Sequence, residues 1–162
     1  MDSKCTGAKC EHCPLREADF VPPEENRGAH VAVVGNFPQE YEVKESRPFM
    51  GPAGNEFTRY LDSEGLSRGQ VHWTTAVLCA PPEGDMDRFL AVIKKENKKI
   101  TRENKRRKEQ GLELKPFIPS PIDCCAERLK LELAPFTNII ACGTKAAKAV
   151  IHKSATIMSL RG

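Results

Sequence analysis

The sequence has no apolar stretch that approaches the about 20 residues needed to cross a membrane. It also lacks an opening charged segment followed by a short apolar one, the pattern of a secretory signal peptide. No internal repeat is evident. These absences argue against membrane-spanning and secreted proteins, and they predict a cytoplasmic protein with no membrane partner.

Size and composition permit one folded domain. The 162 residues are 40% hydrophobic, which is enough for one sizeable core that does not need disulfide bonds for its stability. The net charge is only +3, so the overall charge identifies no partner. We therefore expect a single domain over residues 1–162. Because the closing Ser-Leu-Arg-Gly resembles no capping or tail segment, we also expect the natural chain to continue past residue 162.

Positive charge is concentrated in one segment. Between Lys94 and Lys115 there are ten Lys or Arg residues against four Glu, within a helix-prone stretch that shows little apolar periodicity after Ile100. We expect a basic helical insert at about 86–116 that projects from the core. Such a helix attracts the phosphate backbone of a nucleic acid, although an ordinary solvated helix fits the pattern equally well. The candidate backbone-binding residues are Lys94, Lys95, Lys98, Lys99, Arg102, Lys105, Arg106, Arg107 and Lys108.

Short β-branched segments alternate with helical segments along the chain. Strands are expected at residues 30–35, 71–78 and 138–143. Helices are expected at residues 53–65, 85–113, 122–133 and 144–151. Asp123 and Thr144 are the expected N-caps of the last two helices, and residues 36–52 are expected to form a long polar loop. The alternation predicts an α/β fold with a mostly parallel sheet.

One edge of the predicted sheet is the expected ligand site. In parallel sheets, ligands bind beyond the carboxyl ends of the strands. Gly35, Thr75 and Gly143 end or follow the strand segments, so we expect them to gather at that edge.

The cysteines indicate a metal centre. Seven of them occur in 162 residues, and disulfides are rare in a reducing cytoplasm. Cys10 and Cys13 form a Cys-x-x-Cys pair in a polar lead-in, where a thioredoxin-like redox pair would not lie. Cys79 follows the second predicted strand and Cys125 begins a predicted helix, so both can reach the lead-in. Zinc and iron–sulfur clusters both accept four thiolates, and the spacing does not distinguish them.

Other residues leave alternatives open at this centre. Cys5 and Cys124 are further candidate ligands, and His12 is a candidate zinc ligand. Any single cysteine could instead be a small buried hydrophobic residue, as we expect for Cys142 at the end of an apolar strand. The hypothesis of a metal centre therefore depends on several cysteines occurring together.

Residues 47–54 read Arg-Pro-Phe-Met-Gly-Pro-Ala-Gly. This segment is very similar to the Arg-Pro-Phe-Val-Gly-x-Ala-Gly motif of the family-four uracil-DNA glycosylases, the iron–sulfur branch of that superfamily. Residues 33–39 stand where the family has a Gly-Glu-Ala-Pro-Gly loop. The resemblance is co-linear and covers nearly the whole chain except the basic insert. Further matching segments are residues 10–15, 71–82, 125–133, 139–147 and 160–162.

The resemblance implies a three-layer αβα fold and a [4Fe–4S] cluster, with zinc as the alternative. The match of residues 125–133 to a Cys-x-x-x-Leu-x-x-Glu-Leu helix is the reason to prefer Cys125 to Cys124. The family resemblance also implies two kinds of partner. One is DNA, single- or double-stranded, and the other is further domains of a longer polypeptide. The implied cluster ligands are Cys10, Cys13, Cys79 and Cys125.

The resemblance also assigns roles in base excision, in which a flipped base is stacked on a ring, read at its edge and cut from the sugar. Phe49 is the implied stacking ring, and the alternative for it is an ordinary core aromatic. Glu42 is implied to position water or the cationic sugar. Asn36 and Thr75 stand at the catalytic and uracil-reading positions. The implied cradle for the base carbonyl consists of Gly35, Phe37, Pro38 and Gln39.

Three positions depart from the family pattern. Asn36 replaces a glutamate, Gln39 replaces a glycine that permits close backbone approach, and Thr75 replaces the asparagine that reads uracil. The family's late His-Pro loop is not among the 162 residues. The chain is thus a divergent and C-terminally incomplete match.

Three interpretations follow from this pattern. The first is a hydrolase, a uracil-DNA glycosylase domain that is incomplete or part of a larger DNA-processing protein such as a viral DNA polymerase, in a bacterial or virus-infected cell. The second is a catalytically inactive glycosylase fold that binds DNA or protein. The third is a zinc-stabilised regulatory domain.

Overall fold

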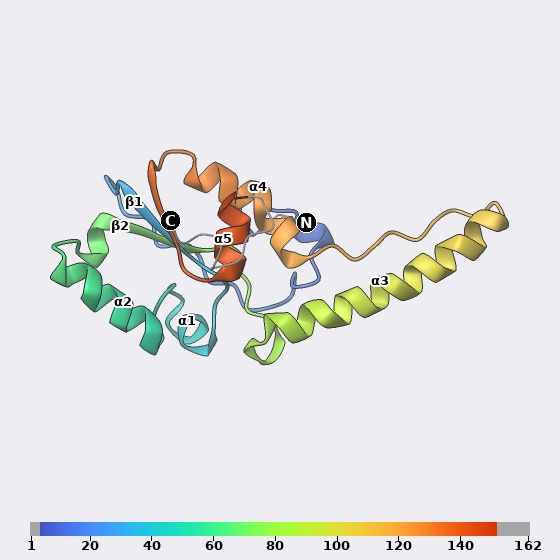
Figure 1. Ribbon diagram of the computed structural model, residues 1–162, viewed down its shortest axis with the longest axis horizontal. Coiled ribbons are helices and arrows are strands. Elements are labelled where there is room, and N and C mark those ends of the chain that lie inside the picture. Colours follow the sequence, from blue (N-terminus) through green and yellow to red (C-terminus); the bar gives the residue numbers. More distant parts are fainter. Residues whose placement is uncertain (1–3, 152–162) are drawn as a thin grey trace.

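Three short parallel strands lie at the centre of the molecule in the computed structural model, which describes residues 4–151 (Figure 1). Val31 pairs with Val71 on one side and with Asn138 on the other, so the first strand is central. The strand order is β2-β1-β3, which confirms the predicted parallel sheet. The strands are β1 (Val31–Gly35), β2 (Val71–Thr75) and β3 (Asn138–Ala141).

Helices connect these strands in the order that the sequence predicts. Gly65, with φ of +81°, follows the second α-helix as expected. None of the helices in the described part of the chain has the length and apolar content to cross a membrane. The α-helices are α1 (Glu40–Glu45), α2 (Pro52–Ser63), α3 (Met86–Glu109), α4 (Pro121–Leu133) and α5 (Thr144–Ile151). Short 3₁₀ helices are η1 (Cys10–His12), η2 (Arg68–Gln70) and η3 (Pro82–Gly84).

The side chains of β1 alternate between two apolar layers, as strand geometry requires. Ala32 shares one buried cluster with Leu129 of α4 and with residues of α5. Val33 shares the opposite cluster with Leu61 of α2. Helices therefore cover both faces of the sheet, and the expected αβα layering is confirmed.

The prediction of an uninterrupted loop over residues 36–52 is wrong, because α1 lies within it. Gln39 and Glu42 cap each other: the side chain of Gln39 accepts from the backbone of Glu42, and Gln39 N donates to the Glu42 carboxylate at 2.9 Å. The box uses Gln where Ser or Thr is usual, so the sequence carried only a weak signal for it.

The expected N-cap of α4 is also wrong. Ser120, and not Asp123, accepts hydrogen bonds from the first turn, from Ile122 N at 3.1 Å and from Asp123 N at 3.4 Å. Pro121 fills the first helical position, where its missing N–H costs nothing. Asp123 thus lies inside the first turn, where its charge still favours the helix dipole.

The second strand ends at Thr75, earlier than the predicted end at residue 78. Beyond Thr75 the chain leaves the sheet and contacts the lead-in, since Val21 N donates to Leu78 O at 2.9 Å. Phe20 and Cys79 form an isolated antiparallel bridge in the same region. The apolar character of residues 77–79 therefore reflects burial against the lead-in and not membership of the sheet, whereas Ala76 packs in the cluster formed with α4 and α5.

The basic segment forms a helix that begins on the core and then leaves it. Met86 and Ile93 of α3 are buried, whereas none of residues 94–109 is buried. Figure 1 shows the outer part of α3 projecting from the rest of the molecule, with the following segment running back beside it. In the structure the basic segment is thus helical over residues 86–109, while the matching segment at residues 160–162 lies outside the described residues.

Candidate functional site

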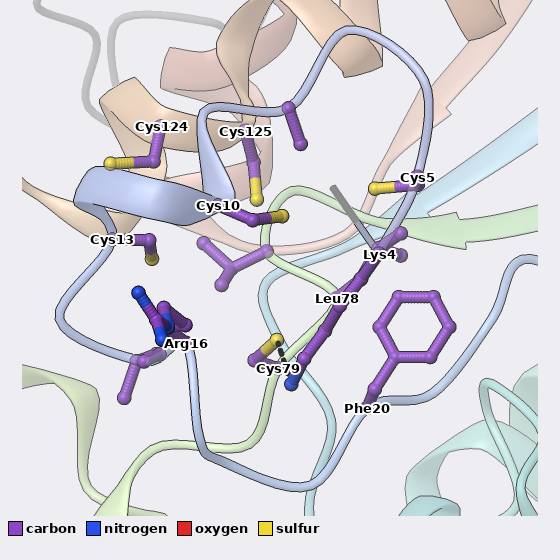
Figure 2. A pocket seen from close by; sticks show the side chains of 13 residues that line it. Lys4, Cys5, Cys10, Cys13, Arg16, Phe20, Leu78, Cys79, Cys124 and Cys125 are labelled. Carbon is purple, nitrogen blue, oxygen red and sulfur yellow. Dashed lines mark hydrogen bonds between the residues drawn. The ribbon is translucent and has the colours of Figure 1, made fainter. Parts of the chain in front are cut away.

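Cysteine side chains from distant segments line one pocket, which we call the cysteine pocket (Figure 2). The lead-in, the segment after β2 and the first turn of α4 all contribute to it. The fold therefore brings together the predicted ligands, although they are far apart in the sequence. The cysteines of this pocket are Cys5, Cys10, Cys13, Cys79, Cys124 and Cys125.

Orientation separates the two neighbouring cysteines of α4. In Figure 2 the sulfur of Cys125 points into the cysteine pocket, whereas the sulfur of Cys124 points away from its centre. On the opposite wall, Lys4 Nζ donates to Cys79 Sγ at 3.8 Å. Cys142 lies elsewhere and packs against the apolar cluster on the α2 side of the sheet.

A close backbone approach holds the lead-in against α4. Lys9 N donates to Cys124 O at 2.9 Å. Gly7 has φ of +81°, and a Cβ there would lie 3.2 Å from the Cα of Arg128. Glycine is therefore required at this position both for its left-handed backbone and for the approach.

The thiols of the cysteine pocket are electrostatically coupled. The pKa of Cys79 is raised to about 11, because burial and the nearby cysteines raise it more than the Lys4 ammonium lowers it. Burial likewise raises the pKa of Cys5 to about 11 and of Cys124 to about 12. These thiols are thus neutral near pH 7 in the absence of a cation, so a thiolate-bound metal would displace their protons on binding.

The donor set of the cysteine pocket consists of sulfur, which suits an iron–sulfur cluster or zinc. His12 does not line the pocket; its exposed ring lies 3.6 Å from the Glu11 carboxylate. Within residues 4–151, no three His, Cys, Asp or Glu side chains converge closely enough to hold one metal ion. The sulfurs therefore share a pocket without closing on a single point.

The carboxyl ends of the strands meet at one edge, as predicted. Gly35 pairs with Thr75 in the sheet. Cys142 N donates to Val34 O at 2.7 Å, which brings the following Gly143 to the same edge. This strand edge, formed by Gly35, Thr75 and Gly143, is the second candidate site.

Phe49 lies over the strand edge with a strained backbone. Its φ is +58°, a left-handed conformation that costs a bulky residue about 1–3 kcal/mol. A Cβ on Gly35 would lie 2.9 Å from Phe49 Cζ, and a Cβ on Gly54 would collide with the Phe49 carbonyl. The Phe49 ring centroid is 5.2 Å from that of Trp73. The half-buried ring thus faces the edge while it also packs on the core.

The buried carboxylate of Glu42 fastens the loop that carries Phe49. Its Oε1 accepts from Met50 N at 2.9 Å and from Gly51 N at 2.8 Å. Its Oε2 accepts from Gln39 N at 2.9 Å. Charge-assisted bonds of this kind are about twice as strong as neutral ones, so Glu42 fixes α1 and the Phe49 loop relative to each other.

Asn36 caps α5 from the loop after β1. Its Oδ1 accepts from Ala146 N at 2.9 Å, in the first turn of the helix. The predicted cap, Thr144, is instead the first helical residue, so that prediction is wrong. Gly143 has φ of +103°, and a Cβ there would lie 2.5 Å from the Asn36 amide nitrogen. Gly143 therefore makes room for Asn36.

The other predicted cradle residues differ in exposure. Pro38 is buried, Phe37 is half-buried and Gln39 is exposed. Lys145 of α5 lies with its Nζ 5.8 Å from the centre of the Phe37 ring and 2.8 Å from the Asp87 carboxylate. The sequence reasoning missed Lys145, whose only signal is its position just after the glycine that follows the third strand.

Arg128 is the second residue that the sequence reasoning missed. It is 3% exposed, and its guanidinium donates to Thr75 O at 2.7 Å and to Ala76 O at 3.0 Å. It also donates to Glu132 at 2.6 Å, while its Nε is buried without a hydrogen-bond partner among the described residues. The available signal was a charged residue one turn after Cys125 on the apolar face of the predicted helix.

The predicted backbone-binding residues all lie on the projecting part of α3. Arg107 is half-buried and the others are exposed. They line neither the cysteine pocket nor the strand edge (Figure 1).

The three-layer fold and the two candidate sites define an α/β domain with a ligand edge and a cysteine pocket. Residues 22–160 match the family described as the uracil DNA glycosylase superfamily. This range is most of the chain. The chain therefore belongs to the uracil-DNA glycosylase superfamily.

Curated relatives match shorter parts of the chain. The type-4 uracil-DNA glycosylase of Saccharolobus solfataricus is 40% identical over 89 residues, which are 51% of this chain and 41% of that protein. The one from Sulfurisphaera tokodaii is 41% identical over 76 residues, 45% of this chain and 34% of that protein. The one from Pyrobaculum aerophilum is 39% identical over 75 residues, which are 45% of this chain and 38% of that protein. The chain thus spans less than half the length of these relatives.

Glu132 titrates in a buried network that borders the strand edge. Its Oε1 lies 2.7 Å from His72 Nε2 and its Oε2 accepts from Arg128. Burial raises the pKa of Glu132, but the bonds from His72 and the charge of Arg128 outweigh burial and hold the pKa below its ordinary value of 4.5. The carboxylate therefore stabilises the fold only where it is ionised.

We predict that Glu132→Gln lowers the free energy of unfolding by about 1–3 kcal/mol at pH 7. Because the folded-state pKa is lowered, this stabilisation is complete above the unfolded-state pKa and is lost as the pH falls through the folded-state value. The difference between the two proteins should therefore shrink as the pH falls below the ordinary pKa of 4.5. Urea unfolding at pH 7 and at low pH measures it, and an equal difference at both would contradict the assignment.

Proposed function

We propose that this chain is a uracil-DNA glycosylase domain, which hydrolyses the N-glycosidic bond of a uracil flipped out of DNA. The observation that carries the proposal is the placement of Phe49 over Gly35 and beside Thr75, despite the strain in its backbone. A flipped base needs a flat apolar surface to replace the stacking that it loses. The relatives, named as type-4 uracil-DNA glycosylases, support the same substrate.

The surrounding residues support distinct roles in this proposal. The Phe49 ring stacks on the base, and the backbone from Gly35 to Gln39 cradles its carbonyl. Both oxygens of Glu42 already accept backbone amides, which supports a positioning role for Glu42 more than activation of water. Phe37 and Pro38 form the apolar floor next to Lys145.

A catalytically inactive DNA-binding module is the second candidate, and two hydrogen bonds favour it. Thr75 Oγ1 donates to Val77 O at 2.8 Å, so the hydroxyl that would read uracil is used within the fold. Asn36 Oδ1 accepts from Ala146 N, so the side chain at the catalytic position caps a helix. The proposal of an active enzyme therefore depends on water being positioned by the remaining groups of the edge.

A uracil-excision assay separates these two candidates. Single- and double-stranded oligonucleotides with one uracil are incubated with the protein and cleaved at abasic sites with alkali. We expect strand cleavage at uracil, and we expect Phe49→Ala to lower the rate by about 100-fold because the base loses its stacking surface.

Phe57→Ala is the matched control for the assay, because Phe57 packs in the same apolar cluster with its ring centroid 6.4 Å from that of Phe49. It should lower the rate by less than about fivefold. An equal loss of excision rate in the two variants would mean that Phe49 is an ordinary core aromatic and not the stacking ring. No cleavage by the unmodified chain would favour the binding module.

We further propose that the cysteine pocket holds a [4Fe–4S] cluster bound by Cys10, Cys13, Cys79 and Cys125, with zinc as the alternative metal. The presence of these cysteines, from three separate segments, in the lining of one pocket supports a resident metal. The orientation of Cys125 into the pocket supports its choice over Cys124. Such a group would tie the lead-in to the end of β2 and to α4, and its role would be structural.

Single Cys→Ser variants test this ligand set. Anaerobically purified protein should be brown, with absorbance near about 400 nm and bound iron and sulfide. Replacement of Cys10, Cys13, Cys79 or Cys125 should remove most of this absorbance, whereas Cys124→Ser and Cys5→Ser, as controls from the same pocket, should retain it. A colourless protein that contains zinc would overturn the cluster and support the zinc alternative.

The cellular setting is part of the proposal. None of the seven cysteines, all of which lie within the described residues, is joined in a disulfide, which supports a reducing cytoplasm in a bacterial or virus-infected cell. The projecting basic helix supports a place within a larger DNA-processing protein, such as a viral DNA polymerase, whose other domains would engage the same DNA.

A further inference from the structure

Two asparagines of α3 bind the segment that runs back along this helix. Asn97 Oδ1 accepts from Ile118 N at 2.9 Å, and its Nδ2 donates to Ile118 O at 2.8 Å. Asn104 makes the same pair of bonds with Lys115, at 2.8 and 2.9 Å. Each asparagine side chain thus bonds both the N–H and the C=O of one residue, as a neighbouring strand does in a β-sheet.

The spacing of the two asparagines matches the spacing of their partners. The seven residues from Asn97 to Asn104 rise about 10.5 Å along a helix. The three residues from Lys115 to Ile118 span about 10 Å in an extended chain. Helix and return segment are therefore in register, and the whole arm (residues 94–118) is ordered without a partner.

The asparagines also determine which face of α3 the return segment covers. Glu96 and Glu103 occupy one flank of the helix, where Glu96 pairs with Lys99 at 2.7 Å and Glu103 pairs with Lys115 at 2.7 Å. Arg107 is turned toward the return segment, since its Nε donates to Glu113 O at 2.5 Å. Some charged side chains of the arm therefore form contacts within the arm itself and stabilise it.

The remaining face of α3 carries cations alone over three turns, and we call it the basic stripe. Its members recur at i, i+3, i+4, i+7, i+10 and i+11, a spacing that places them on one side of a helix. They lie opposite Asn97 and Asn104, and all are exposed. Within the described residues, Lys99 is the one member that forms a close ion pair, with Glu96 at 2.7 Å, while the charge of Arg106 acts on the Glu103 carboxylate. The basic stripe consists of Lys95, Lys98, Lys99, Arg102, Lys105 and Arg106.

We propose that the basic stripe binds the phosphate backbone of DNA, outside the strand edge. From Lys95 to Arg106 it is about 16 Å long, which corresponds to about five phosphates of one strand. The stripe has no aromatic side chain to stack on bases, and its Lys and Arg side chains are the usual partners of phosphate oxygens, so we expect its contacts to depend little on sequence. Because the arm is already ordered, binding does not incur the entropy of folding it.

This proposal depends on DNA being the partner but not on base excision, so it is tested on uracil-free DNA. The stripe variant combines Lys95→Gln, Lys98→Gln, Arg102→Gln and Arg106→Gln, since Gln preserves helix propensity. The control variant removes the same charge from exposed residues of other helices. Its substitutions are Lys44→Gln, Arg59→Gln, Lys130→Gln and Lys148→Gln.

We expect the stripe variant to bind DNA at least about tenfold more weakly at 0.1 M salt. Its plot of log affinity against log salt should lose about 3 to 4 units of slope, because each lost phosphate contact removes about 0.7–0.9. The control should retain the slope within about 1 unit. Circular dichroism should show equal helix content in the three proteins.

Three results would overturn the proposal. An equal loss in the two variants would mean that net charge alone attracts DNA. Unchanged binding by the stripe variant would make the stripe an ordinary solvated face. Tighter binding to RNA of the same sequence than to DNA, lost in the stripe variant, would assign the stripe to RNA. Each result is independent of whether the chain excises uracil.

Discussion

The buried guanidinium of Arg128 determines where β2 ends. It donates to the carbonyls of Thr75, the last residue of β2, and of Ala76, the residue that follows it. A buried cation that loses its partners destabilises a protein by about 3–5 kcal/mol, so the chain must pass where Arg128 can bind it. Thr75 at the strand edge and Cys79 in the cysteine pocket lie in the segment that Arg128 binds or just after it. The position of this segment therefore determines where both residues lie.

The same residue links the two candidate sites through α4. Cys125 lies one turn before Arg128, and its sulfur points into the cysteine pocket. Gly7 of the lead-in approaches the Arg128 backbone closely, which places Cys10 on the same side. A metal in the pocket would therefore hold α4, the lead-in and the end of β2 together. The strand edge, with Phe49 and Gly35, would be stabilised as a consequence and not by direct contact.

Local patterns in the sequence predicted most helices and strands, but they did not predict the contacts between distant segments. The β-branched segments ending at Gly35 and near Gly143, and the Cys-x-x-Cys pair at Cys10, led to the correct layers and to the gathering of the cysteines. The helix α1 was missed because its capping box begins with Gln39 in place of Ser or Thr. The cap by Asn36 and the role of Arg128 were missed because each depends on a distant partner that no local spacing encodes. Tertiary hydrogen bonds decided these cases over intrinsic propensity.

Through its bonds to Thr75 and Ala76, Arg128 couples α4 to the strand edge. Hydrogen exchange of the Ala76 and Val77 amides, which donate to Gly35 O at 2.8 Å and Asn36 O at 3.2 Å, tests it directly. We predict that Arg128→Met speeds exchange at these amides by at least about tenfold, while Lys130→Met on the exposed face of α4 leaves it unchanged. Equal protection of Ala76 and Val77 in both variants would mean that Arg128 does not couple α4 to the strand edge.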